Sequence, residues 1–389
     1  MSVNGRISDG GPQMGSGRRT LSGGRVLVSG LLLAAMGLGL AAQGPPPPPP
    51  PPPGGGVIQV QTGPAPAGAP AGAPAAGRPA GPPAPAALAP LKPEAIARAN
   101  EILKATRQAL GGDKLAGVKT LVASGRTKRV RGNNLVPIEF EIDLEMPDKY
   151  LRKDESPAEE TDPTSTGFNG EDLIQLPVPT APTMAARPGG PPPPGPAQIE
   201  AQRKARVVTI KQDFVRFALG IFADSFSTYP LTFGFAAQAE APQGKADVLD
   251  VRGPGNFAMR FFINSQTRQP IMVSWTQPPT NVIVLAPGQA QPPTIAPGAV
   301  VVTGPAAPAA TATQAEKDAY TKEVQAVRQK AQATLVENRI YYADYRDVDG
   351  VQFPFRLRRA IGTDTTEETT FDRFRINTKI APQKFIPVK

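Results

Sequence analysis

Apolar and polar residues alternate over several stretches of this chain, as they do in β-strands that bury one face. The most regular stretch is Ile138–Met146, where every second residue is apolar and the four residues between them are carboxylates. It follows Thr120–Arg131 after a Gly-Asn-Asn turn signal, so the two stretches are predicted to form a hairpin. Arg126 and Lys128 then share the carboxylate face, which predicts a solvated, charge-paired surface in preference to a cation site.

A second antiparallel group is predicted near the C-terminal end. Asp349-Gly350 is the residue pair that a type I′ turn favours, and it joins the β-rich runs Ile340–Asp347 and Val351–Arg359. A third run, Glu367–Ile376, breaks its alternation by one residue, which predicts a β-bulge near Arg373. The group has one apolar and one charged face, so another apolar element must cover its apolar face.

Three helices are predicted from apolar spacings of three and four residues. Pro93–Leu110 begins with proline and is followed by two glycines, and Gln314–Leu335 carries only a thin apolar stripe. The stripe of Ile199–Phe222 is too wide for a surface helix, so this helix is expected to be buried against the apolar face of the sheet. Further strands are predicted over residues 150–152, 167–175, 229–237, 246–251, 257–263 and 270–275.

Candidate ligand-binding residues come from the apolar faces of these elements. In the first hairpin, Ala123 and Gly125 lie opposite bulkier apolar residues, which leaves room either for large neighbours or for a ligand. The residues predicted to face a common interior are Phe140, Ile142, Leu144, Phe214, Phe217, Phe353, Phe355 and Phe371. The pattern alone fits a closed core and the wall of a ligand cavity equally well.

The amino-acid composition restricts the catalytic and metal-binding chemistry that is open to this chain. The chain contains neither cysteine nor histidine, which excludes disulfides, Ser-His-Asp and Cys-His catalysis, and metal sites built from His and Cys. Only carboxylate, Lys, Tyr and Arg chemistry remains, and no carboxylate pair stands out from the surface pattern. We therefore expect a protein that is not an enzyme and that needs no cofactor; a hydrolase acting through carboxylates is a remote alternative.

The first 42 residues have the features of a cleaved export signal. Basic residues Arg18, Arg19 and Arg25 precede an apolar run, Val26–Leu40, which ends at small residues. A twin-arginine signal and a retained anchor are the alternatives, but the run is short for a span of about 20 residues. No later stretch has the length and apolarity of a membrane span. The mature chain is expected in the periplasm, either free or associated with the cell envelope.

Proline-rich tracts divide the remainder. Residues 43–92 are rich in Pro, Ala and Gly and are predicted to form a disordered or semi-rigid tether. Similar tracts at about 176–197 and 277–313 interrupt patterned sequence on both sides, so they are interpreted as insertions in one domain over residues 93–389. Without residues 1–42 the net charge falls from +9 to +6, since that segment holds four Arg and one Asp. No basic stripe with interleaved aromatics is present, so nucleic acid is not an expected partner.

Several phrases resemble a known family. ILKATRQALGG, VLDVRGPGNFAMRFFINSQTRQPIMVSW and DVDGVQFPFRLRR followed by FDRFRINTKIAPQKFIP resemble outer-membrane lipoprotein-sorting and carrier proteins of the LolA/LolB-like superfamily, over residues 93–175, 199–276 and 338–388. The resemblance implies an α+β fold: an open antiparallel β half-barrel of about nine to eleven strands, capped by helices. It also implies an apolar cavity that holds acyl chains, and so favours a cavity over a closed core.

The resulting hypothesis is a periplasmic carrier that holds the acyl chains of a lipoprotein or lipid, in outer-membrane lipoprotein sorting or lipid transfer. The alternative is an envelope module, a stress sensor or structural protein, that uses the same fold to bind a protein partner. The Pro-rich tether and the two insertions depart from the family pattern.

Export predicts a defined new N-terminus. N-terminal sequencing of the protein from a periplasmic fraction should begin near Gln43, because cleavage is expected after the small residues that end the apolar run. Recovery of intact residues 25–40 in washed membranes would instead identify the segment as an anchor.

Overall fold

The computed structural model describes residues 89–132, 134–157, 161–178, 195–241, 244–292 and 294–387. The predicted export signal, most of the predicted tether and residues 179–194 of the first insertion lie outside the described residues. The alternating segments form the strands β1 (Thr120–Arg131), β2 (Asn134–Glu145), β3 (Lys149–Glu155), β4 (Thr164–Asn169), β5 (Asp172–Leu176), β6 (Thr232–Ala241), β7 (Gly244–Arg252), β8 (Ala258–Asn264), β9 (Pro270–Gln277), β12 (Val336–Val348), β13 (Val351–Ile361) and β14 (Asp364–Ile376).

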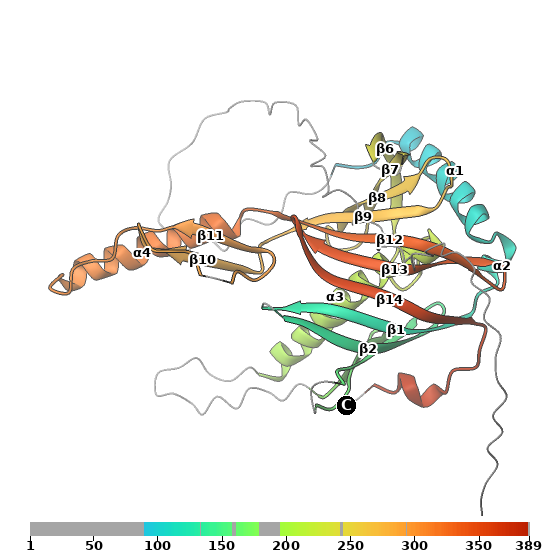
Figure 1. Ribbon diagram of the computed structural model, residues 1–389, viewed down its shortest axis with the longest axis horizontal. Coiled ribbons are helices and arrows are strands. Elements are labelled where there is room, and N and C mark those ends of the chain that lie inside the picture. Colours follow the sequence, from blue (N-terminus) through green and yellow to red (C-terminus); the bar gives the residue numbers. More distant parts are fainter. Residues whose placement is uncertain are drawn as a thin grey trace, which may run out of the picture. The chain divides into compact units, whose positions relative to one another are not determined.

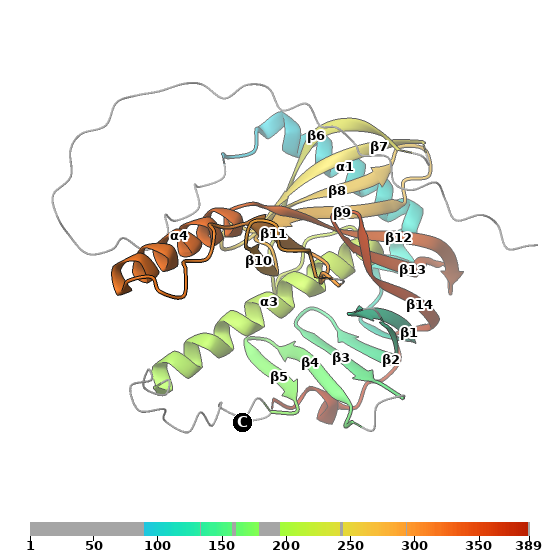
Figure 2. The same cartoon turned by 60° about the vertical axis from the view of Figure 1, so that its left-hand side comes forward.

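These twelve strands form one open antiparallel sheet in the order β5-β4-β3-β2-β1-β14-β13-β12-β9-β8-β7-β6. The sheet does not close, since β5 and β6 are its two edges, and Figure 2 shows it curving around a long helix. The fold is thus the predicted open half-barrel, with one strand more than the expected maximum. Residues 167–175, expected as one strand, form parts of two, because Gly170 and Glu171 make a turn between β4 and β5.

Register confirms the predicted hairpins. In the β1–β2 pair Ala123 lies opposite Ile142, and Gly125 lies opposite Phe140, as the alternation requires. Pairing of β1 with β14 skips Asp372, so the bulge expected near Arg373 is present. Gly125 has no room for a side chain, since a Cβ there would lie 2.2 Å from the backbone oxygen of Thr370. Bulky neighbours therefore occupy the space that the small residues of β1 leave.

Helix α3 (Pro196–Phe222) lies against the concave face of the sheet and contacts β4, β5, β9 and β13 (Figure 2). Every residue from Phe214 to Phe222 is buried, whereas none before Val207 is. A helix segment that is buried on all sides needs partners all round, and this segment finds them in the sheet and the elements next to it. The predicted burial of this helix is therefore confirmed for its C-terminal half.

Two further helices also contribute buried residues to the main apolar core, among them Leu103 and Leu115. Helix α1 (Pro93–Leu110) packs on β6 and is followed by α2 (Asp113–Ala116). The strands β10 (Asn281–Leu285) and β11 (Ala299–Thr303) form a separate parallel pair within the second insertion, and α4 (Gln314–Gln332) contacts both (Figure 1). Strands in this Pro-rich tract were not expected, since its alternation is short and broken by prolines.

The C-terminal segment covers part of the outer face. A short 3₁₀ helix, η1 (Pro382–Phe385), contacts β3, and Phe385 joins an apolar cluster with Val122 and Leu151 on that side of the sheet. The Lys384 ammonium lies 2.7 Å from one oxygen of Glu141 and 2.7 Å from one of Asp143. The carboxylate face is thus charge-paired, but through Lys384; the predicted partner Arg126 pairs instead with Asp372 of β14, and Asp143 is buried and not solvated.

The close packing of Gly220 of α3 against Tyr342 predicts an energetic coupling between these two residues. A Cβ on Gly220 would lie 2.4 Å from the Tyr342 ring, so Gly220→Ala overpacks this contact. We expect it to lower the free energy of unfolding by about 1–2 kcal/mol, although alanine is the better helix former by about 1 kcal/mol. In a Tyr342→Val background the same change should be neutral or stabilising. Urea unfolding of the four proteins of this double-mutant cycle tests the contact, and an equal loss in both backgrounds contradicts it.

Candidate binding site on the concave face

The eight predicted ligand residues lie in one apolar cluster. All are buried: Phe140, Ile142 and Leu144 are on β2, Phe214 and Phe217 on α3, Phe353 and Phe355 on β13, and Phe371 on β14. The structure thus brings together side chains that are up to 231 positions apart in the chain. Whether they line a ligand cavity stays a prediction, and the pocket described below is lined by other residues.

Aromatic contacts link the helix to the sheet within this cluster. Phe371 packs edge-to-face on Phe140, with ring centroids 5.3 Å apart, and is stacked on Phe217 of α3 at 6.1 Å. Phe214 of α3 packs edge-to-face on Phe168, with ring centroids 5.6 Å apart, and is tilted against Tyr150 at 5.3 Å. Each such pair adds about 0.5–1.5 kcal/mol beyond the apolar area that it buries. Side chains of α3 therefore fill the concave face of the sheet in this conformation.

Two tyrosines of β12 hold α3 in place. The Tyr342 hydroxyl donates to the backbone carbonyl of Arg216, and the Tyr345 hydroxyl donates to that of Gly220 at 2.8 Å. Burial raises the pKa of both hydroxyls, so they remain neutral donors at every physiological pH. Together with the packing of the Tyr342 ring on Gly220, these bonds fix the C-terminal half of the helix on the sheet.

Arg216 provides a further contact between α3 and the sheet. Its guanidinium carbon lies 5.1 Å from the ring centroid of Phe257 and 4.2 Å from that of Trp275 on β9. Its Nη1 donates to Asp213 at 2.8 Å. Burial lowers the pKa of Arg216 from its usual value, and Asp213 opposes that shift. Trp275 is the single tryptophan of the chain, so it senses the position of α3.

A layer of charged residues adjoins the aromatic cluster on the same face. Residues that lie opposite one another on paired strands share a face of the sheet. Glu367 of β14 lies opposite Arg129 of β1 on one side and opposite Arg359 of β13 on the other. On β3, Arg152 lies opposite Ile142, and its guanidinium carbon is 4.8 Å from the Phe140 ring centroid. The concave face therefore changes along the strands from aromatic to arginine-rich.

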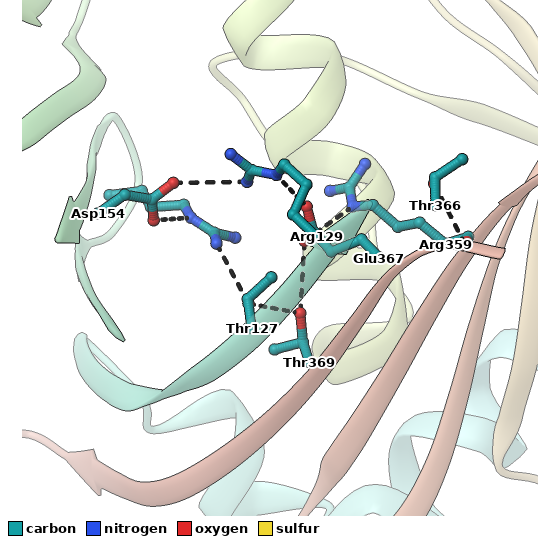
Figure 3. Close-up of polar contacts among 8 residues, drawn as sticks. Thr127, Arg129, Asp154, Arg359, Thr366, Glu367 and Thr369 are labelled. Carbon is teal, nitrogen blue, oxygen red and sulfur yellow. Dashed lines mark hydrogen bonds and ion pairs between the residues drawn. The ribbon is translucent and has the colours of Figure 1, made fainter. Parts of the chain in front are cut away.

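Hydrogen bonds join this charged layer into a network, drawn in Figure 3. Arg129 Nε donates to Glu367 Oε2 at 2.9 Å, and Arg152 Nε donates to Asp154 Oδ1 at 2.6 Å. The Arg359 Nε lies farther away, 3.8 Å from Glu367 Oε1. Below the network, the hydroxyls of Thr127 and Thr369 share a buried hydrogen bond of 2.8 Å.

Charge balance in the network favours a cation excess. Burial alone would raise the pKa of the Glu367 carboxyl, but the guanidinium groups of Arg359, Arg152 and Arg129 outweigh it and hold that pKa below its usual value. Burial likewise disfavours the charge of Arg152, but Asp154 and Glu367 outweigh it and raise its pKa. Three guanidiniums thus face two carboxylates in this network.

A pocket of about 320 Å³ opens beside this network. Arg129, Arg152 and Arg359 line it from the sheet, and Arg206, Ile210 and Asp213 line it from α3. Tyr150 forms part of the wall, and burial raises the pKa of its hydroxyl to about 12. The pocket thus lies between the exposed half of α3 and the arginine-rich part of the sheet.

Sequence reasoning did not find this charged layer. Arg129 occupies a position of the same alternation as Ala123 and Gly125, and the sequence analysis did not single it out. A charged residue in an apolar register is the local signal that could have found it. Glu367 and Arg359 come from distant strands, and their meeting with Arg129 depends on the order β1-β14-β13.

Comparisons with known proteins are confined to structure. No protein-family model and no curated protein matches the sequence. The fold is similar to a LolA superfamily protein from Nitrosomonas europaea, with 9% identity, a TM-score of 0.38, and coverage of 74% of this chain and 97% of that chain. It is also similar to a putative outer membrane lipoprotein-sorting protein domain from Vibrio parahaemolyticus, with 9% identity, a TM-score of 0.35, and coverage of 75% and 96%.

A third similar structure is a DUF1329 family protein from Desulfovibrio piger, with 6% identity, a TM-score of 0.36, and coverage of 75% of this chain and 97% of that chain. The first of these three solved structures is a LolA superfamily protein, and the sequence phrases resemble that superfamily. Within the described part of the chain, no helix has the length and apolarity to cross a membrane.

Glu367 gives the network a predicted pH dependence. Because its folded-state pKa is lowered, the stability that it contributes is complete above its unfolded-state pKa of about 4.5 and is lost as the pH falls through the lower folded-state value. Glu367→Gln should lower the free energy of unfolding at pH 7 by about 1.5–3 kcal/mol, and this difference from the wild type should shrink below about pH 4.5.

The exposed neighbour Glu368, on the other face of β14, supplies the control. Glu368→Gln should change the free energy of unfolding by less than about 0.5 kcal/mol at both pH values. Urea unfolding at pH 7 and pH 3.5 makes the comparison. A loss in Glu367→Gln that is the same at both pH values would show that the carboxylate is not held ionised by its arginines.

Proposed function

We propose that this chain is an exported binding protein of the cell envelope that holds acyl chains of a lipid or lipoprotein against the concave face of its half-barrel. One observation carries the proposal: an open twelve-stranded sheet presents an aromatic-rich concave face against which the buried half of α3 packs. The predicted export signal and the resemblance to lipoprotein-sorting proteins support the location and the ligand class.

Binding at this face requires an exchange between ligand and helix. Side chains of α3 occupy the space next to Phe140 and Phe371, so an acyl chain enters as part of α3 moves away. Burying a chain of about sixteen carbons is favourable by on the order of 12 kcal/mol at about 0.8 kcal/mol per methylene. Releasing four or five buried side chains of α3 costs a similar amount at about 1.5–3 kcal/mol each. The exchange is therefore close to balanced, as a carrier that loads and releases its ligand needs.

The N-terminal half of α3 is the part suited to start this movement. None of its residues before Val207 is buried, and it follows an insertion and not a tight turn. Its C-terminal half is held by the Tyr342 and Tyr345 hydroxyls. A ligand that enters between the helix and the sheet thus meets the weakly attached half first.

The filled interior also favours a second candidate function. A half-barrel whose interior is occupied by its own helix can serve as a rigid module that binds a protein partner through its outer surface. In that case the eight predicted residues form a closed core, and acyl ligands do not bind.

Binding of a fluorescent fatty acid separates the two functions. The carrier predicts saturable binding below the critical micelle concentration, with a change in Trp275 emission, because Arg216 of α3 leaves its indole ring when the helix moves. Phe217→Arg should weaken binding at least tenfold, since it places a charge in the apolar interior. Val208→Arg, on the exposed side of the same helix, should bind as the wild type does.

Wild-type protein that binds no acyl probe and carries no co-purified lipid, as judged by mass spectrometry, would overturn the carrier function. In the closed-core case, Phe→Ala changes at Phe140, Phe217 and Phe371 should each lower the free energy of unfolding by about 3–5 kcal/mol. Circular dichroism of Phe217→Arg and Val208→Arg confirms that the binding comparison is made on folded proteins.

A further inference from the structure

We propose that the arginine-lined pocket between α3 and the sheet binds the phosphate group of an acyl-chain ligand, so that the interior recognises an anionic amphiphile at both ends. This inference rests on the proposed function, because the pocket adjoins the face that holds the acyl chain. It adds a headgroup site and a chemical class of ligand: a phosphate oxyanion attached to a hydrocarbon chain.

The position of the pocket on the concave face supports a headgroup site. The pocket lies where the concave face changes from aromatic to charged, and Arg152 touches both parts, since it lines the pocket and stacks on Phe140. A chain that lies along Phe140 and Phe371 therefore has its polar end at the guanidinium layer. The pocket volume of about 320 Å³ is sufficient for a phosphate group with part of its attached alcohol.

Unused hydrogen-bonding capacity supports it further. The carboxylates of Glu367 and Asp154 form ion pairs with Arg129 and Arg152, with nitrogen–oxygen distances of 2.6–3.5 Å. In the described part of the chain, the terminal nitrogens of Arg359 make no hydrogen bond, and its Nε is 3.8 Å from the nearest carboxylate oxygen. The Arg206 side chain is exposed and has no ion pair among the described residues.

These two guanidiniums come from opposite walls of the pocket, Arg359 from β13 and Arg206 from α3. Planar guanidinium groups bind phosphate oxygens in pairs of parallel hydrogen bonds, more specifically than an ammonium group does. A phosphate between them would also join the loosely attached half of α3 to the sheet. Headgroup binding thus closes the helix over the ligand.

A purely structural role for the network makes a different prediction. If the arginines only balance Glu367 and Asp154, then the charge of a ligand headgroup is irrelevant to its affinity. Two ligands that share one acyl chain and differ only in a phosphate distinguish these cases. Palmitoyl glycerol and palmitoyl lysophosphatidic acid are such a pair, and inorganic phosphate tests the headgroup without a chain.

The binding of each compound to the full mature chain is measured through Trp275 emission and by calorimetry at low ionic strength. We expect lysophosphatidic acid to bind at least tenfold more tightly than palmitoyl glycerol, and this preference to fall as salt is added. Arg359→Gln and Arg206→Gln should each reduce the preference threefold or more, with palmitoyl glycerol bound as by the wild type. Arg206 is exposed, so its replacement leaves the fold intact even if Arg359→Gln destabilises it.

Matched controls are available on the same elements. Arg358 is next to Arg359 but faces the other side of β13, and Lys204 is an exposed cation of α3 outside the pocket. Arg358→Gln and Lys204→Gln remove the same net charge and should leave the phosphate preference unchanged. A loss of preference in these controls would show that net charge, and not the pocket, attracts the anion, and would overturn the site.

The remaining outcomes distinguish a failure of the headgroup site from a failure of the acyl-binding function. Equal affinity for the two lipids overturns the headgroup site and leaves the acyl-binding function standing. Absence of binding by both lipids overturns the acyl-binding function. Inorganic phosphate that binds in an Arg206- and Arg359-dependent manner, without any lipid preference, supports the oxyanion site and assigns it to free phosphate.

Discussion

The packing of α3 into the concave face is the contact on which the rest of this structure depends. An open antiparallel sheet with one apolar face must cover that face, and a curved sheet of twelve strands presents a large one. Here α3 provides cover together with α1, and the α3 segment Phe214–Phe222 is buried on every side. The Tyr342 hydroxyl, the stacked Arg216 and the close approach at Gly220 all serve to hold that segment.

This arrangement divides the interior along the strands. Near the buried half of α3 the face is aromatic, and near its exposed half it carries Arg129, Arg152 and Arg359. The division matches the two parts of an amphiphile, with a hydrocarbon chain at one end and a charged group at the other. A helix that is firmly held at one end and weakly attached at the other can admit such a molecule without exposing the whole interior to water.

The sequence predicted local features well because they depend on neighbouring residues. Alternation determined which side of β2 is apolar, and Asp349-Gly350 located the β12–β13 turn. The broken alternation before Phe374 located the bulge, and the wide stripe of α3 indicated its burial. Each of these follows from a few consecutive residues and the periodicity of one element.

Features that join distant segments were not predictable in this way. The alternation of β1 placed Arg129 on the apolar face, but only the strand order brings it to Glu367, which is 238 residues away. The burial of Asp143 depends on Lys384 folding back from the C-terminal segment. Residues 167–175 form two strands because they turn at Gly170, and the parallel pair of β10 and β11 is formed across a proline-rich loop.

The most direct test of the central claim is a distance between α3 and the sheet, with and without an acyl ligand. The chain contains no cysteine, so spin labels at Val208→Cys on α3 and Glu368→Cys on the outer face of β14 are the only labelled sites. Pulsed electron spin resonance should give one narrow distance distribution without ligand and a second, longer one with saturating palmitoyl glycerol, which carries the acyl chain without the phosphate. A single unchanged distribution while the ligand is bound would contradict the exchange of helix and ligand at the concave face.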